Sequence, residues 1–201
     1  MSRPWDDPRI QQFLAKAHEY FDDIARQHGM SCSSEEVGYW LRYENKLMAM
    51  SICYDAMRSH EVEVGFAKLA VQPGASRPAM DLALVMRWKN HPDADSVFAR
   101  ASDLPSLSAA LERLANMTKE QASGILDGDP DELASLEKFQ ARVIGEYNLR
   151  MWGRKRLEEA WSEKDYAAYA ATANEFRPFL SPQELDRLGN AERMIAEHKT
   201  D

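Results

Sequence analysis

The feature that most constrains the fold is a change of hydrophobic period at Gly29. Before it, apolar residues follow the i, i+3, i+4, i+7 spacing of an amphipathic helix. They are Ile10, Phe13, Leu14, Ala17, Tyr20, Phe21 and Ile24. Asp7 is the predicted N-cap, Pro8 the first helical residue, and Gly29 the stop after His28. After Gly29 the period is two, which is typical of strands.

Three alternating segments follow, over 39–44, 48–55 and 61–66. They predict an antiparallel meander with one apolar face. The residues expected to be buried together against Phe13, Phe21 and Ile24 are Tyr43, Met48, Met50, Ile52, Val64 and Phe66. Parity places Tyr43 opposite Met48, with a turn at Asn45-Lys46, and requires a second loop of three or five residues within 55–59. Residues 30–36 predict a weaker edge strand.

The second half of the sequence predicts helices. Residues 80–88 favour a helix over a buried strand, and everything beyond Leu104 has helical character. Helix starts are indicated at Pro105, at Asp129-Pro130 and at Ser181-Pro182, and Thr118 with Gln121 predicts a capping box. Gly145 and Gly153 indicate a bend or a close helix contact.

The predicted fold class is therefore α+β: an N-terminal helix on a three- or four-stranded antiparallel meander, followed by a C-terminal helical bundle. We expect a single domain over 1–201, with the helix and sheet in 1–72, a connecting segment in 73–103 and the helical part in 104–201.

Charge and cysteine content restrict the function classes. The 201 residues carry a formal net charge of −8, which argues against nucleic acid or an anionic membrane as partner. The sequence shows no signal peptide and no apolar run of the roughly 20 residues that span a membrane. We therefore expect a cytoplasmic protein in which Cys32 and Cys53, the only cysteines, are free thiols.

Short catalytic motifs are missing from the sequence. It contains no GxxxxGK[ST], GxGxxG, GxSxG, HExxH or CxxC, so we predict no catalytic residue, no cofactor and no metal. Three weaker patterns have structural explanations. His18 and Asp22 have metal-ligand spacing but suit a solvated pair, Cys53 with His60 suits a packed cysteine, and the calcium-loop start at Asp127, Asp129 and Asp131 suits helix capping.

The run from Arg150 to Arg156 is the only basic cluster. We interpret it as a helix face whose charge is absorbed by Glu146, Glu158 and Glu159 at helical spacing. A binding site for an acidic protein partner is the second interpretation, and a nucleic-acid site the third.

Two resemblances add little about function. The stretch from Ala160-Trp161 through Tyr166 to Ser181-Pro182 resembles one tetratricopeptide-like helix pair, which implies a helical hairpin without a repeat array. The order of the His28-Gly29 helix end, the 39–66 meander, Leu126-Asp127-Gly128-Asp129 and Leu180-Ser181-Pro182 resembles a loosely defined group of uncharacterised small bacterial cytosolic proteins. That resemblance implies no activity and no functional residues.

The functional prediction is a non-catalytic protein-binding domain, such as an immunity- or antitoxin-type inhibitor of a basic partner. The predicted partner-binding residues face away from the predicted core; they are Trp40, Arg42, Glu44, Glu61 and Glu63. Trp40 packing under a C-terminal helix is an equally weighted alternative. Two different functions also fit the sequence: a structural subunit of a larger assembly, and a small enzyme with a site at the second hairpin, formed by Asp55, Arg58, His60 and Glu61.

Overall fold

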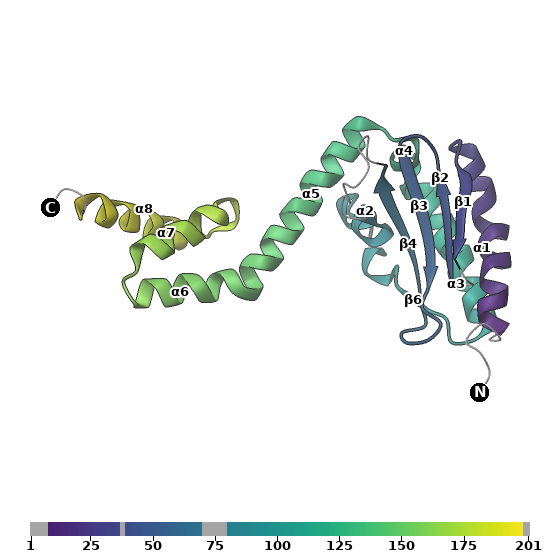
Figure 1. Cartoon of the computed structure of the whole chain (residues 1–201), viewed down its shortest axis with the longest axis horizontal. Coiled ribbons are helices and arrows are strands. Elements are labelled where there is room, and N and C mark those ends of the chain that lie inside the picture. The colour runs from purple at the N-terminus through teal and green to yellow at the C-terminus, as the bar shows by residue number, and fades with distance from the viewer. Residues whose placement is uncertain (1–7, 37–38, 70–79, 199–201) are drawn as a thin grey trace. The chain divides into compact units, whose positions relative to one another are not determined.

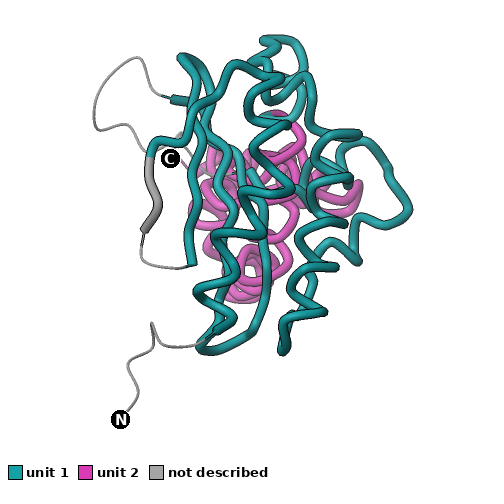
Figure 2. Tube along the Cα trace, turned by 90° about the vertical axis from the view of Figure 1, so that its right-hand side faces the viewer, with its two compact units in different colours: residues 1–137 teal, residues 138–201 magenta. Residues whose placement is uncertain are grey.

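A computed structural model describes residues 8–36, 39–69 and 80–198 of the chain. It divides into two compact units, residues 1–137 and 138–201, which are described separately (Figure 2). The predicted N-cap Asp7 lies outside the described residues, as does the 70–79 part of the predicted connecting segment.

Unit 1 is a two-layer α+β structure, as the sequence predicts. Its elements in chain order are α1 (Pro8–Gln27), β1 (Ser31–Glu36), β2 (Trp40–Glu44), β3 (Met48–Tyr54), β4 (Glu61–Lys68), β5 (Met80–Asp81), α2 (Leu82–Trp88), η2 (Ala94–Ser96), β6 (Ala99–Arg100), α3 (Leu104–Gln121), α4 (Ser123–Asp127) and the first part of α5 (Pro130–Asn148).

The sheet of unit 1 is antiparallel, and within the described residues it has six strands. Strands β1 to β5 follow one another in space in chain order, and β6 also pairs with β4. The helices form a single layer: α1 packs along α3, and α1, α2, α3 and α4 contact strands of the sheet (Figure 1). Figure 2 shows the strands and helices of this unit as two separate layers.

The predicted parity of the strands is confirmed, but the register is shifted by two residues. Tyr43 lies opposite Met50 rather than Met48, and Glu44 lies opposite Ala49. The turn is therefore at Lys46 and Leu47, and a hydrogen bond of 3.0 Å from Asn45 N to Met48 O closes it. The second loop has five residues, 56–60, between Asp55 and Glu61, one residue later than predicted. In both hairpins the paired residue moves by two positions, so every side chain keeps its predicted face.

The core of unit 1 contains the predicted apolar set. Phe13, Phe21 and Ile24 of α1 are buried in one cluster with the inward residues of the meander. Those residues are Tyr43, Met48, Met50, Ile52, Val64 and Phe66. Helices α3 and α4, which the sequence pattern assigns to the C-terminal helical part, contribute Leu111, Leu114, Ile125 and Leu126 to the same cluster.

The predicted capping box at Thr118 is wrong. Thr118 is fully buried inside α3, and its hydroxyl donates to the Leu114 carbonyl at 2.8 Å. A threonine can satisfy its hydroxyl in this way within a helix, and the sequence pattern does not distinguish that use from a cap. The cap of α3 is Asp103, which forms a capping box with Ser106.

Unit 2 is helical and has its own apolar core. Its elements are the second part of α5, the π-helical turn η3 (Leu149–Gly153), α6 (Arg154–Ser162), α7 (Tyr166–Glu175), η4 (Arg177–Phe179) and α8 (Pro182–Glu197). Tyr169 and Ala173 of α7 are fully buried in it, together with Leu157 and Leu188. The predicted capping box at Ser181 and Glu184 is present.

The two glycines that interrupt the long helix mark close contacts, as predicted. A Cβ at Gly145 would lie 2.5 Å from Phe179 Cζ, and one at Gly153 would lie 3.1 Å from Phe176 Cε2. Gly153 also ends the π-helical turn, the kind of local widening that bends a helix. Across the described ranges, the helices contain no apolar stretch sufficient to cross a bilayer.

Candidate functional site

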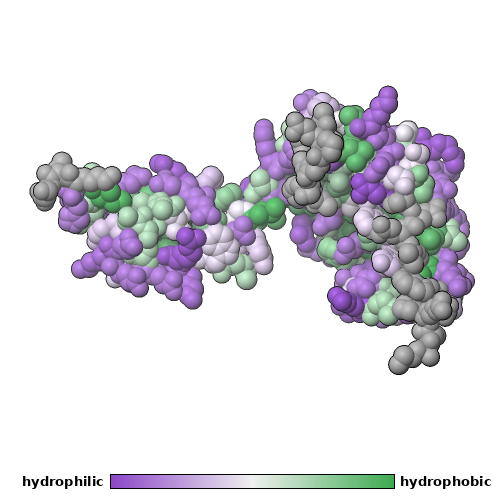
Figure 3. Space-filling model, viewed as in Figure 1, coloured by the Kyte–Doolittle hydropathy of each residue, from purple (hydrophilic) through white to green (hydrophobic). Residues whose placement is uncertain are grey.

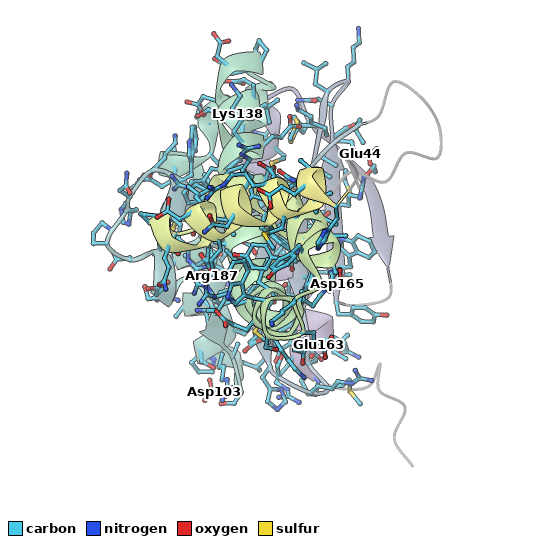
Figure 4. All side chains as sticks on the ribbon, turned by 90° about the vertical axis from the view of Figure 1, so that its left-hand side faces the viewer. Glu44, Asp103, Lys138, Glu163, Asp165 and Arg187 are labelled. Atoms are coloured by element: carbon cyan, nitrogen blue, oxygen red, sulfur yellow. The ribbon has the colours of Figure 1, made fainter. Side chains whose placement is uncertain are left out.

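The outward face of the unit 1 sheet carries the residues that the sequence singles out for partner binding. Trp40, Arg42 and Glu44 project from β2, and Glu61 and Glu63 from β4. All five are partly or largely exposed, whereas the alternate positions of the same strands are buried. Figure 3 shows hydrophilic residues interspersed with residues of intermediate hydropathy over this side of the unit. Figure 4 labels Glu44.

Strand register places an aromatic ring, a thiol and a carboxylate in one row across this face. Trp40 pairs with Cys53 on β3, and Cys53 pairs with Glu63 on β4. With about 4.8 Å between strands, the backbones of Trp40 and Glu63 are about 10 Å apart. The aromatic and acidic parts of the predicted site are therefore close enough for one bound segment to contact both.

The charges on this face are unequally neutralised. Arg42 Nε and Glu44 Oε1 are 2.5 Å apart, so these two residues pair with each other. Glu61 Oε1 is 3.8 Å from Arg100 Nε, a loose pair with an arginine that is mostly exposed. Within the described part of the chain, Glu63 has no ion-pair partner.

Glu63 lies in a locally acidic environment. Partial desolvation raises the pKa of its carboxyl, and three nearby carboxylates raise it further. They belong to Glu61, Asp81 and Asp55. A cation placed beside Glu63 would relieve this repulsion.

A mostly apolar pocket of about 280 Å³ adjoins the acidic row. Its lining comes from the start of α1, the start of β2, the end of β3 and the following loop: Ile10, Tyr39, Trp40, Cys53, Tyr54, Asp55, Ala56 and Met57. Two of these residues are unusually exposed for apolar side chains, Tyr39 at 43% and Met57 at 65%. The pocket thus presents apolar surface to solvent next to carboxylates.

Two polar groups in the pocket lining are affected by burial, the indole N–H of Trp40 and the thiol of Cys53. Trp40 Nε1 is buried, and among the described residues it has no hydrogen-bond acceptor. A buried donor left unpaired costs about 1–3 kcal/mol. Burial, with the nearby carboxylate of Glu63, raises the pKa of the Cys53 thiol to about 11, so the thiol stays protonated at neutral pH.

The alternative site at the second hairpin is occupied by structural hydrogen bonds. The Asp55 carboxylate accepts from the backbone N–H groups of Met57, Arg58 and Ser59 at 3.1–3.3 Å. Those bonds, chiefly the one from Ser59, lower the pKa of Asp55. The carboxylate therefore shapes the loop, an Asx-type role.

The other members of that hairpin do not converge on a reacting position. His60 has a positive φ of 56° in the loop, and its Nδ1 lies 3.4 Å from Arg9 Nη1. Arg9 Nη1 also donates to the Ser102 carbonyl at 3.2 Å. The His60 imidazole is therefore part of a contact that ties the loop to α1 and to the residues before α3.

The candidate metal patterns are also parts of structural networks. Asp22 Oδ1 accepts from Tyr43 Oη at 2.6 Å and lies 2.9 Å from His18 Nδ1. Asp127 Oδ1 lies 2.6 Å from His28 Nδ1, and Asp129 caps α5. Among the described residues there is no group of three or more His, Cys, Asp or Glu arranged to hold a metal ion.

The basic cluster of unit 2 is largely paired with carboxylates. Lys155 Nζ lies 3.7 Å from Glu159 on the same helix, as the sequence predicts. Arg154 and Arg156 instead approach Glu184 and Glu175 of neighbouring elements, at 3.5 and 3.9 Å. Arg187, labelled in Figure 4, adds a 2.7 Å pair with Glu158. These pairs make the cluster a charged helix face.

Cys32 and Cys53 do not form a disulfide, and strand order explains why. Cys32 lies on β1 and Cys53 on β3, and β2 separates these two strands. Their backbones are therefore about 10 Å apart. A disulfide requires Cα atoms within about 7 Å. An intramolecular bridge is thus incompatible with the sheet.

The sequence missed the pocket, although it contained a weak signal for it. Met57 lies in a loop, where an exposed methionine has no core to fill, and Tyr39 precedes the strand that it flanks. The contribution of Ile10 depends on how α1 crosses the end of the sheet, which no local pattern reports.

In comparisons with known proteins, the chain matches no family model, no curated protein and no solved structure.

Proposed function

We propose that unit 1 binds a basic protein partner through the outward face of its sheet and acts as a non-catalytic inhibitor of the immunity or antitoxin type. The observation that carries the proposal is the acidic row beside the pocket, where the Glu63 carboxylate has carboxylate neighbours and, among the described residues, no cationic partner. A lysine or arginine of a partner would complete this arrangement.

The distribution of charge between the two units supports unit 1 as the part that binds a basic partner. Residues 1–137 contain 14 Lys and Arg against 22 Asp and Glu, which gives −8, whereas residues 138–201 contain 11 of each. The whole net charge of the chain therefore belongs to unit 1. The electrostatic field of a negatively charged unit accelerates its association with a basic protein and makes the association rate salt-dependent.

The composition of the face is suited to tight binding as well as steering. Tyr39 and Trp40 supply rigid aromatic area of the type that dominates interface energies. The carboxylates at the rim contribute mainly to specificity and association rate. Strands β2 to β4 hold these groups on a hydrogen-bonded scaffold, so little ordering is required on binding.

A comparison of two charge-reversal variants tests the proposal. Glu61→Lys/Glu63→Lys changes the proposed face, and Glu112→Lys/Glu120→Lys makes the same change in net charge at exposed positions of α3 in the helical layer. Each protein is immobilised and exposed to lysate of the native host, and captured proteins are identified by mass spectrometry. The partner is then purified and its affinity measured by calorimetry.

We expect a basic protein that binds the wild type and the α3 variant and is lost from the face variant. Its own activity should fall when the wild-type chain is added. A partner that binds both variants equally, or one that is itself acidic, would contradict the proposed face. Turnover of a small molecule that depends on Asp55 or His60 would instead support the enzyme alternative.

A further inference from the structure

We infer that the pocket of unit 1 receives one large apolar side chain of the basic partner, from a segment that also carries a Lys or Arg within about two residues of it. The inference rests on the proposed function, because it specifies which part of the basic partner binds to the same face.

The chemistry of the pocket walls favours an apolar side chain as its occupant. The volume of about 280 Å³ is at the small end of the range for ligand sites, about 300–1,000 Å³. Its walls are mainly apolar, from Ile10, Ala56, Met57 and three aromatic residues. A leucine or phenylalanine side chain suits these walls, because it buries only apolar surface.

The position of Glu63 sets the spacing between the anchor and the cation. Cys53 forms part of the pocket wall and pairs directly with Glu63 on the neighbouring strand. The two backbones are therefore about 4.8 Å apart, and one residue of an extended segment covers about 3.3 Å. A segment with its apolar side chain in the pocket brings a cation to Glu63 within one or two residues.

The indole N–H of Trp40 provides a reporter of whether the pocket is occupied. This N–H is buried in a residue that lines the pocket and finds no acceptor among the described residues. Recognition therefore combines an apolar anchor and a nearby cation.

Short peptides test this recognition element with the full-length protein. The probes are acetylated and amidated nine-residue peptides of alternating Lys and Ser with Leu, Phe or Ser at the centre, and the same set with Glu replacing Lys. Binding is followed through the tryptophan indole N–H resonances in ¹H–¹⁵N spectra. The Trp40 resonance is identified by its loss in Trp40→Phe.

We expect the Lys peptides with Leu or Phe to bind at least about tenfold more tightly than the Lys peptide with Ser, and to shift the Trp40 resonance. Met57→Ser should reduce this preference, because Met57 is 65% exposed and its loss removes pocket wall without removing core. Met151→Ser, a similarly exposed methionine of unit 2, is the matched control and should leave the preference unchanged.

The outcomes separate this inference from the proposed function. Equal binding of the Leu, Phe and Ser peptides, lost in Glu61→Gln/Glu63→Gln, overturns the pocket inference and leaves the basic-partner proposal standing. Equal binding of the Lys and Glu sets overturns the combined recognition of anchor and cation. The absence of binding by every peptide at millimolar concentration also overturns the inference, while the capture experiment decides the proposed function independently.

Discussion

Two identical substitutions in unit 2 should have opposite effects on stability. Gly189 lies in the interior of α8, is exposed, and has no atom within 4 Å of the position that a Cβ would take. Gly189→Ala should therefore stabilise unit 2 by about 1 kcal/mol, the difference in helix propensity between the two residues. Gly145→Ala gains the same propensity term but places its methyl group against the Phe179 ring, 2.5 Å from Cζ.

The cost at Gly145 follows from what the ring can do. Overpacking costs about 1–3 kcal/mol if Phe179 stays, and displacing the half-buried ring to solvent forfeits a burial of similar worth. After the propensity gain, Gly145→Ala should destabilise unit 2 by about 1 kcal/mol, roughly 2 kcal/mol below Gly189→Ala. In a Phe179→Ala background the obstacle is gone, and Gly145→Ala should become stabilising.

Urea unfolding of the full chain labelled with 5-fluorotryptophan provides the assay. Trp152 and Trp161 pack against Phe176 and Tyr169 of the unit 2 core, at 4.9 and 5.2 Å between ring centroids, so their ¹⁹F resonances report on this unit. Equal stabilisation by Gly145→Ala and Gly189→Ala in the wild-type background would refute the close packing of α5 on η4. Failure of the Phe179→Ala background to change the sign would assign the effect to another cause.

Four further predictions concern unit 1. Asn45→Ala should cost about 2–4 kcal/mol in urea unfolding, because its side chain donates to the carbonyls of His28 and Leu126 and accepts from the N–H groups of Leu47 and Met48; the exposed Asn174→Ala should change stability by less than about 0.5 kcal/mol. Trp40→Phe should leave stability unchanged or raise it by up to about 1 kcal/mol, because it removes an unpaired donor; a loss of more than about 1 kcal/mol would contradict this expectation. In alkylation at pH 8 with mass spectrometry, exposed Cys32 should react well before Cys53, whose thiol pKa is raised to about 11, and equal rates in the folded protein would contradict the packing of β3. Affinity for the basic partner should fall as the pH is lowered from 7 through the raised pKa of Glu63, because a bound cation favours the ionised carboxylate; Glu63→Gln should flatten that profile in calorimetry, and an unchanged profile would remove Glu63 from the interface.

The sequence predicted the layers of unit 1 because side-chain parity survives errors in pairing. A register shift of two residues moved Tyr43 from Met48 to Met50 without exchanging the buried and outward faces. The actual register depends on Asn45, whose side-chain oxygen accepts from the two N–H groups that follow the turn. The local pattern around Asn45 is equally compatible with a positive φ in a two-residue turn, so it does not distinguish that role from side-chain capping.

The candidate site was only partly predictable, for a related reason. Trp40, Arg42, Glu44, Glu61 and Glu63 share one face because alternation alone determines the face of a strand residue. The pocket beside them depends on contacts between segments far apart in sequence, such as Ile10 of α1 and Met57 of the second loop. Ion pairing was likewise hidden, since Arg156 turns to Glu175 of another helix rather than to a neighbour on its own.

Carboxylate footprinting of the complex tests the proposed binding face most directly. Water-soluble carbodiimide with an amine labels exposed Asp and Glu side chains, and mass spectrometry measures the labelling of each residue in the free chain and in the chain saturated with its captured partner. We expect the labelling of Glu61 and Glu63 to fall severalfold on binding, while that of Glu112 and Glu120 on α3 does not change. Unchanged labelling of Glu61 and Glu63 in the saturated complex, or protection confined to α3 or to unit 2, would contradict the proposed binding face.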